Sequence, residues 1–327
     1  MAEIQSFVLN ILSEFSSFLW GVPMVVLLFG THLFLTFRTG GIQRHLGKAI
    51  KMTLNRSSAG GDISNFSALM VAMAATVGTG NIIGVGTAIY IMGCLAILFL
   101  NASWVDDALL LIIKSAFSAD AVGGGFAGGG IMLAMRYGIS RGLFSNESGL
   151  GSAPIVSAAA KTDNAVKQAL IASSATFWDT VIICALTGIV LVSSVLAHPD
   201  INFSDGAVLT NMAFGKLHVW GSGLLTIALL SFVFSTILGW SYYAERCVEY
   251  IGGKRVLIIF RIIWSSAVFI GCVAKLDLVW VFADCANALM AIPNIAMLIL
   301  LSGVVAAETK KYLNGDKLNE YDPTIEH

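Results

Sequence analysis

The amino-acid sequence predicts an all-α, polytopic membrane protein. Of the 327 residues, 57% are hydrophobic and only 12% are charged, and the mean hydropathy is +0.82. Soluble chains carry about 25% charged residues, so the composition excludes an ordinary soluble domain. The apolar runs lack the alternation typical of barrel strands, and helices satisfy their own backbone in lipid. With a net charge of −1, the chain has no general basic surface for nucleic acid.

Apolar runs that are long enough to cross a bilayer occur six times. A helical span takes about 20 predominantly apolar residues. The six runs are 15–37, 66–104, 168–197, 218–243, 256–274 and 278–306. A seventh run, 121–160, is rich in glycine and carries Arg136, Arg141 and Glu147. We predict seven net crossings of the bilayer.

The distribution of lysine and arginine predicts the orientation. The loop between the first two runs is basic and contains Arg38, Arg44, Lys48, Lys51 and Arg56. Basic loops stay on the cytoplasmic side, so the N-terminus is expected outside. Seven crossings then place the basic residues near the C-terminus inside. We predict a multi-pass protein of the cell membrane with a cytoplasmic tail at 307–327.

The second run contains a predicted break. Residues 66–100 include no charge, and one straight helix of that length would reach about 52 Å against a hydrocarbon core of about 30 Å. Four glycines between Gly78 and Gly86 weaken the helix by roughly 1 kcal/mol each, with Thr79 and Asn81 among them. The alternative is close helix packing through the GxxxG pattern of Gly80 and Gly84.

A second predicted break lies in the 121–160 run. Polar side chains, three glycines and a proline occur between Gly142 and Pro154. Glu147 is an acid at the predicted depth of the membrane, which makes it a candidate functional residue with Arg136 or Arg141 as partner. Alternatively, Glu147 caps a half-helix or lies at the membrane interface.

Two broken apolar segments indicate a transporter. Non-helical backbone is tolerated at membrane depth only where protein or a water-filled cavity surrounds it, and such breaks mark the binding sites of transporters. The N-terminus of a half-helix has free N–H groups and a positive dipole end, which suit a carboxylate. Unwound carbonyl groups suit a cation.

Hydroxyl groups in the 218–243 run form a candidate cation site. Ser231 and Ser235 are four residues apart and share a helix face, and Thr236 follows directly. The alternative is that these hydroxyls bond to carbonyls of their own helix.

Aromatic and acidic side chains in the remaining runs have weaker assignments. Trp240 is expected to wall a small apolar pocket, whereas Tyr242 and Tyr243 are expected in the interfacial belt. Asp179 and Asp284 are lone acids within apolar runs, and either a relay or structural pairing accounts for them. No signature of an enzyme occurs, so no catalytic activity is predicted.

Four stretches of the sequence together resemble one family. They are Asn65–Ala88, Gly138–Lys161, the segment Thr236–Arg246 (TILGWSYYAER), and Leu289–Asn294 (LMAIPN). On these stretches, and along nearly its whole length, the chain resembles the alanine or glycine:cation symporters, a family that includes the prokaryotic sodium/alanine symporters.

The resemblance implies a leucine-transporter-type helix bundle of two inverted repeats, each beginning with a broken helix. Sodium would drive the uptake of L-alanine, glycine or D-alanine, with no cofactor besides the coupling ion. The implied substrate residues are Thr79 and Gly80, whose backbone would hold the carboxylate, with Asn81 beside them; Phe144, Ser145, Asn146 and Glu147 near the amine and side chain; and Trp240 as the limit on side-chain size. The implied sodium ligands are the carbonyls of Ala74 and Val77 and the hydroxyls of Ser235 and Thr236.

The chain departs from the family pattern in length. Several helices are missing near Ile89–Tyr90, inside the uncharged run, so the first repeat is incomplete. The expected organisation is one transmembrane domain over 1–327, with a span at 15–37, a broken helix fused to the remnant of the first repeat at 66–104, and the second repeat at 121–306. The alternative function is a shortened, non-transporting paralogue with a structural or regulatory role. A passive channel is disfavoured because no ring of charges is evident.

Overall fold

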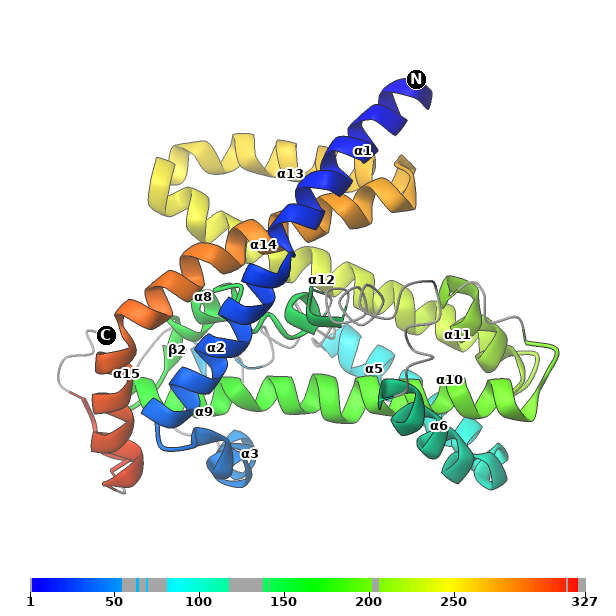
Figure 1. The fold of residues 1–327 in the computed structure, drawn as a ribbon, viewed down its shortest axis with the longest axis horizontal. Helices are drawn as coiled ribbons and strands as arrows, with labels where there is room; N and C mark the ends of the chain where they lie inside the picture. Colours follow the sequence, from blue (N-terminus) through cyan, green and yellow to red (C-terminus); the bar gives the residue numbers. More distant parts are fainter. Residues whose placement is uncertain are drawn as a thin grey trace. The chain divides into compact units, whose positions relative to one another are not determined.

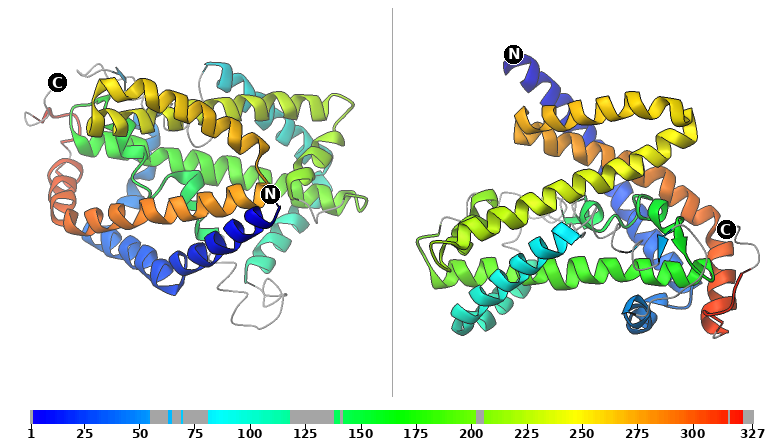
Figure 2. Two further views of the ribbon diagram at one scale, coloured as in Figure 1. Left: turned by 90° about the horizontal axis from the view of Figure 1, so that it is seen from above. Right: turned by 180° about the vertical axis from the view of Figure 1, so that it is seen from behind.

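The computed structural model describes residues 2–54, 63–64, 69, 81–117, 138–140, 142–201, 206–315 and 317–322. This part of the chain is almost wholly helical (Figures 1 and 2), which confirms the predicted helical membrane protein. Its only strands are β1 (Ile63–Ser64) and β2 (Ala160–Lys161), which pair in parallel. The inverted-repeat arrangement stays a prediction.

The chain divides into two compact units. The first contains Met1–Ala72, Met135–Ala175 and Gly239–His327, and the second contains Met73–Ala134 and Thr176–Leu238. Each unit is therefore built from segments that are distant in sequence.

The first apolar run forms two helices instead of one straight span. α1 (Ala2–Leu19) and α2 (Val22–Arg38) meet at an angle of 42°. Gly21 is extended, and Pro23 occupies the first turn of α2, where a proline is tolerated but cannot continue a preceding helix. α1 packs along α14 (Leu276–Leu300), as Figures 1 and 2 show.

The second apolar run bends sharply at its end. α5 (Asn81–Leu100) begins inside the predicted break of Gly78–Gly86, so Gly84 and Gly86 are helical, while residues 70–80 lie outside the described part. A 79° bend then leads through η2 (Ala102–Trp104) to α6 (Val105–Phe117). The segment after residue 104 is thus a helix, with Asp106 and Asp107 in its first turn, where acids are stabilised by the helix dipole.

The second unit has an apolar core in which α5 meets α10 (Ala185–Ala197), α11 (Gly206–Gly215) and the first part of α12 (Gly221–Gly252). Tyr90 stacks on Phe214 with ring centroids 5.5 Å apart, and its hydroxyl lies 2.9 Å from that of Thr187. Outside the spans, Lys216 donates to Asp200 at 2.5 Å, and this bond lowers the pKa of the Asp200 carboxyl.

The 168–197 run forms one continuous helix of 33 residues. It comprises α9 (Ala165–Thr176), a π-helical stretch η4 (Phe177–Cys184), and α10. Asp179 is buried within the π-helical stretch. Such stretches are frequent at functional sites, so Asp179 keeps both interpretations that the sequence allowed.

The remaining apolar helices begin close to their predicted positions. η5 (Lys254–Val256) and α13 (Leu257–Val273) follow α12 and precede α14. α12 extends nine residues beyond the predicted end at 243, because its last turns carry ion pairs in place of apolar contacts. Arg261 donates to both oxygens of Glu245, at 2.6 and 3.1 Å.

The predicted count of seven crossings is only partly tested by the part of the chain that the structure describes. There, four helices are long and apolar enough to cross a membrane, or six if each bent pair counts as one span. The predicted 121–160 run lies partly outside the described residues, at 121–137 and 141. Its described residues form short helices separated by a turn, ending in α8 (Ala153–Ser157) and β2, because glycine and proline interrupt the helix.

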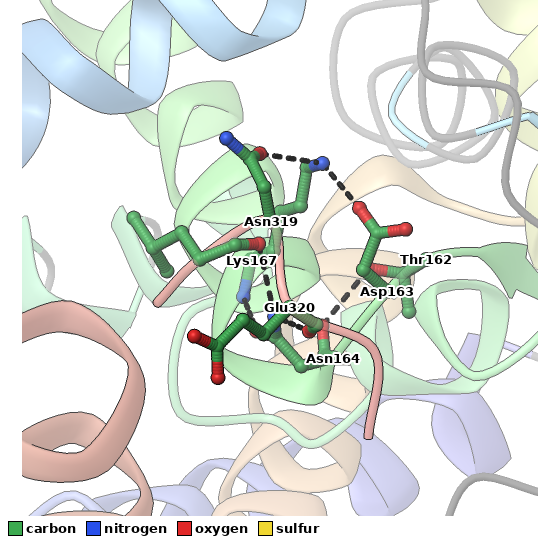
Figure 3. Close-up of polar contacts among 7 residues, drawn as sticks. Thr162, Asp163, Asn164, Lys167, Asn319 and Glu320 are labelled. Carbon is green, nitrogen blue, oxygen red and sulfur yellow. Dashed lines mark hydrogen bonds and ion pairs between the residues drawn. The ribbon is translucent and has the colours of Figure 1, made fainter. Parts of the chain in front are cut away.

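The C-terminal segment is packed within the first unit. After α15 (Ser302–Glu308) and η6 (Thr309–Asn314), Tyr312, Leu313 and Leu318 pack with α3 (Leu46–Leu54) and α9. η1 (Ile42–His45) leads into α3. Figure 3 shows the polar contacts that join this segment to the start of α9, centred on Asn164 and Lys167. The segment predicted as a tail is thus anchored as far as Asp322, whose N–H donates to the Asp163 carbonyl.

Candidate substrate site at the Glu147 turn

A tight turn interrupts the chain inside the polar motif. Residues 142–146 are helical, and the turn that follows ends where α8 begins. Gly149 and Gly151 have φ of 90° and 78°, a conformation that glycine adopts without steric cost. The predicted break in this segment is therefore present.

Glu147 is the only non-glycine residue with positive φ among the described residues, at 53°. Such a conformation is uncommon for a side chain of this size, and strained residues cluster at functional sites. Gly151 lies against α14, where an added Cβ would be 2.9 Å from the Asn294 Oδ1 atom. The turn is thus held in a close approach to that helix.

The Glu147 carboxyl group is buried, with 2% of the residue exposed. Ser152 Oγ donates to Oε2 at 2.9 Å. The Tyr243 hydroxyl lies beside the carboxyl group and faces it as a donor. Apart from each other, Oε1 and this hydroxyl have no hydrogen-bond partner among the described residues. A buried polar group without a partner is costly, so this pair of atoms is suited to receive a polar ligand.

Aromatic rings line the same turn. Phe144 stacks on Trp240 with centroids 6.0 Å apart and planes at 17°, and Trp240 meets Tyr243 edge to face at 5.9 Å. Leu143 and Trp240 also pack on the core of the first unit, which includes Trp20. Phe144, Glu147 and Trp240, three of the predicted substrate residues, are therefore gathered in one place.

The other predicted residues have different positions. Asn146 donates to the Gly142 carbonyl at 2.9 Å, which stabilises the helix before the turn, and Ser145 is part of that helix. Asn81 begins α5, but its side chain is not described. The predicted residues Ala74, Val77, Thr79 and Gly80 lie outside the described residues, as do Arg136 and Arg141.

Ser235 and Thr236 lie on α12 within the second unit. Ser235 is buried, and its hydroxyl donates to the Phe232 carbonyl at 2.8 Å. Ser231 bonds to Ile227 in the same way at 2.9 Å. The local bonding that the sequence left as an alternative is present, and the oxygen lone pairs remain for an ion. No group of three metal-binding side chains occurs among the described residues.

Sequence reasoning misplaced Tyr243. It was expected in an interfacial belt, but it is 2% exposed, because α12 continues to residue 252 and places this face against the turn. Asn294 was also not assigned a role. The neighbouring Pro293 lies inside α14 and removes the helical bond to the Leu289 carbonyl. This proline within an apolar run is the sequence feature that could have drawn attention to Asn294.

An apolar helical chain with a buried acid at a broken segment belongs to the class of multi-pass membrane transporters. The model of the sodium:alanine symporter family matches residues 5–93 and 87–327. The chain belongs to this family. Its relatives are transporters, not enzymes.

Individual relatives agree with this assignment. The chain is 34% identical to an uncharacterized transporter of Haemophilus influenzae, covering 96% of this chain and 98% of the relative. It is 32% identical to the sodium/alanine symporter AgcS of Methanococcus maripaludis, with 93% and 97% covered. It is 36% identical to the probable sodium/glutamine symporter GlnT of Bacillus subtilis, covering 75% of this chain and 50% of that protein.

The length difference from the family is internal. The family model matches in two segments that meet at residues 87–93, which include the predicted junction at Ile89–Tyr90. The alignment to the Haemophilus transporter extends over 449 positions, more than the 327 residues of this chain. Positions of that relative therefore have no counterpart here.

Proposed function

We propose that this chain binds a small neutral amino acid together with sodium and carries both across the cell membrane by alternating access. The observation that carries the proposal is the buried Glu147 carboxylate, which lies beside the Tyr243 hydroxyl at a turn walled by Phe144 and Trp240. A carboxylate oxygen accepts hydrogen bonds from an ammonium group, and aromatic rings are suited to contact a short apolar side chain. The family and the name of AgcS support alanine as the first substrate to test.

The mechanism that we propose couples sodium to the broken helix. Sodium would order the segment at Thr79 and Gly80, whose backbone would then hold the substrate carboxylate. Because sodium would favour the substrate-binding state, the two ligands would bind cooperatively. The glycine-rich sequence around these residues and the family membership support this assignment.

The central experiment is the binding of radiolabelled L-alanine to the purified full chain, with sodium and with potassium in its place. We expect saturable binding in sodium and none in potassium. A folded sample that binds no alanine in sodium would refute the proposal for this chain and favour the non-transporting paralogue.

Thr236→Ala is expected to raise the sodium concentration needed for half-maximal alanine binding by about tenfold, because a hydroxyl ligand to a charged group contributes about 1.5 kcal/mol. Affinity for alanine at saturating sodium should change little. The measurement is alanine binding over a sodium series. Thr226→Ala is the matched control, since Thr226 is exposed on the same helix and bonds to the Ser222 carbonyl. Equal sodium dependence in the variant and the parent chain would remove Thr236 from the site.

Trp240→Leu is expected to admit larger amino acids. Each added methylene in an apolar pocket changes affinity by about tenfold or more, so removing most of the indole should improve competition by 2-aminobutyrate and glutamine against labelled alanine. Glutamine is included because one relative is a probable glutamine symporter. Trp220→Leu is the control, since Trp220 is exposed just before α12. Unchanged selectivity in a folded Trp240→Leu variant would place Trp240 outside the pocket.

A further inference from the structure

A basic pocket lies in the first unit, away from the Glu147 turn. It has a volume of about 330 Å³ and lies between the end of α2 and the helices α15 and η6. α2 completes an apolar helix pair that is long enough to span a membrane and ends at Arg38, while α15 follows the apolar α14. The pocket is therefore at a membrane surface, where the span ends and the headgroup layer begins.

Two cations line this pocket. Arg38 ends α2, and Lys310 lies on η6. Neither forms an ion pair with a described residue, whereas the neighbouring Lys311 is paired with Glu308 and Asp322 at 3.8 and 3.9 Å. The Arg38 guanidinium is placed over the Phe34 ring at 5.8 Å, which holds its planar group at the pocket wall. The pocket thus offers two positive charges that no acidic side chain among the described residues neutralises by an ion pair.

The rest of the lining is apolar. Phe37 is 81% exposed, and Ala306 and Ala307 form the facing wall. The backbone N–H groups of Thr39 and Gly40 already donate to the Leu35 and Phe37 carbonyls. A ligand in the pocket would therefore be bound by the two basic side chains and not by these N–H groups. Cations beside exposed apolar surface at the edge of a membrane suit an anionic amphiphile better than a free anion.

We propose that this pocket binds the phosphate of an anionic phospholipid. The Arg38 guanidinium and the Lys310 ammonium would hold the phosphate oxygens. The glycerol and the first acyl carbons would cover Phe37, Ala306 and Ala307. Free phosphate shares the charged part of this chemistry but gains nothing from the apolar wall.

The test measures binding of dihexanoyl phosphatidylglycerol to the full chain in an uncharged detergent, with dihexanoyl phosphatidylcholine and inorganic phosphate as comparison ligands. Each basic residue near a membrane surface contributes about a fivefold effect, so the double variant Arg38→Gln, Lys310→Gln should bind phosphatidylglycerol about 30-fold more weakly. Lys254→Gln, Arg255→Gln is the matched control, because it removes two cations from η5, just before α13, and should leave binding unchanged.

Ala307→Trp tests the apolar wall without a change of charge. Ala307 is exposed, so the fold should tolerate the larger ring, and phosphatidylglycerol binding should fall about tenfold as the pocket fills. Unchanged lipid binding in this variant would refute the site. Equal losses in the matched control would show general attraction to charge, and inorganic phosphate bound as tightly as the lipid would show a free-anion site, either of which overturns the proposal.

Discussion

Glu147→Gln is expected to weaken sodium-dependent L-alanine binding by about 30-fold or more. The substitution keeps the size of the side chain and an acceptor for Ser152, but it removes the charge. Truncating or neutralising one member of a buried charge pair costs about 2 kcal/mol or more, which corresponds to this factor. The Glu147 carboxyl is bonded to Ser152 and lies beside the Tyr243 hydroxyl, and a glutamine keeps an acceptor for both. The substitution should therefore weaken ligand binding without destabilising the fold.

The measurement is a binding isotherm for labelled alanine, with lactate as a competitor that carries a hydroxyl in place of the ammonium. The parent chain should strongly prefer alanine, and the variant should lose much of that preference. Glu249→Gln is the control, since Glu249 is paired with Arg246 at 3.0 Å near the end of α12. If Glu147→Gln binds alanine as the parent chain does, the carboxylate does not face the substrate amine.

Asn164→Ala is expected to lower the free energy of unfolding of the first unit by about 2–4 kcal/mol. Asn164 is fully buried, and its amide donates to the Leu318 and Glu320 carbonyls at 2.9 and 3.1 Å. Its Oδ1 accepts from the Lys167 N–H at 2.9 Å and so caps α9. Alanine would leave these groups without partners, at about 1–3 kcal/mol for a buried orphan and about 1 kcal/mol for a lost cap.

Unfolding in detergent, followed by circular dichroism, measures this loss. Asn319→Ala is the matched control, because Asn319 is exposed and accepts only a 3.2 Å bond from Lys167 in this cluster (Figure 3); it should change stability by about 0.5 kcal/mol or less. Asn164→Asp keeps the cap but directs a second acceptor at two carbonyls, so it should not restore stability. Full stability in Asn164→Asp would mean that the cap alone matters and the anchoring bonds do not.

Much of the architecture was predictable because it depends on short stretches of sequence. An apolar run of sufficient length forms a helix wherever it lies, since lipid provides no partner for free backbone groups. The helices over 257–273 and 276–300 follow the predicted runs closely for this reason. The break between Gly142 and Pro154 was also predictable, because glycine and proline act on the backbone of their own residues.

The positions where helices bend or extend were less predictable. The bend between α1 and α2 depends on the local geometry of Gly21 and Pro23, within a run that is apolar enough for one span. The extension of α12 depends on ion pairs, including the one between Glu245 and Arg261, residues that lie on different helices. A hydropathy profile does not predict such pairings, because it treats every charged residue as unfavourable in a span, whether or not the residue forms an ion pair.

The sequence was sufficient to predict the class of protein, the polar turn and the candidate acid, because these follow from composition and from neighbouring residues. The surroundings of Glu147 required the fold. Tyr243 is nearly 100 positions away along the chain, and only the packing of α12 brings its hydroxyl to the carboxylate. Arg38 and Lys310 line one pocket, and Asn164 bonds to Leu318, for the same reason. Contacts between distant residues depend on how helices pack, which no periodicity within one segment encodes.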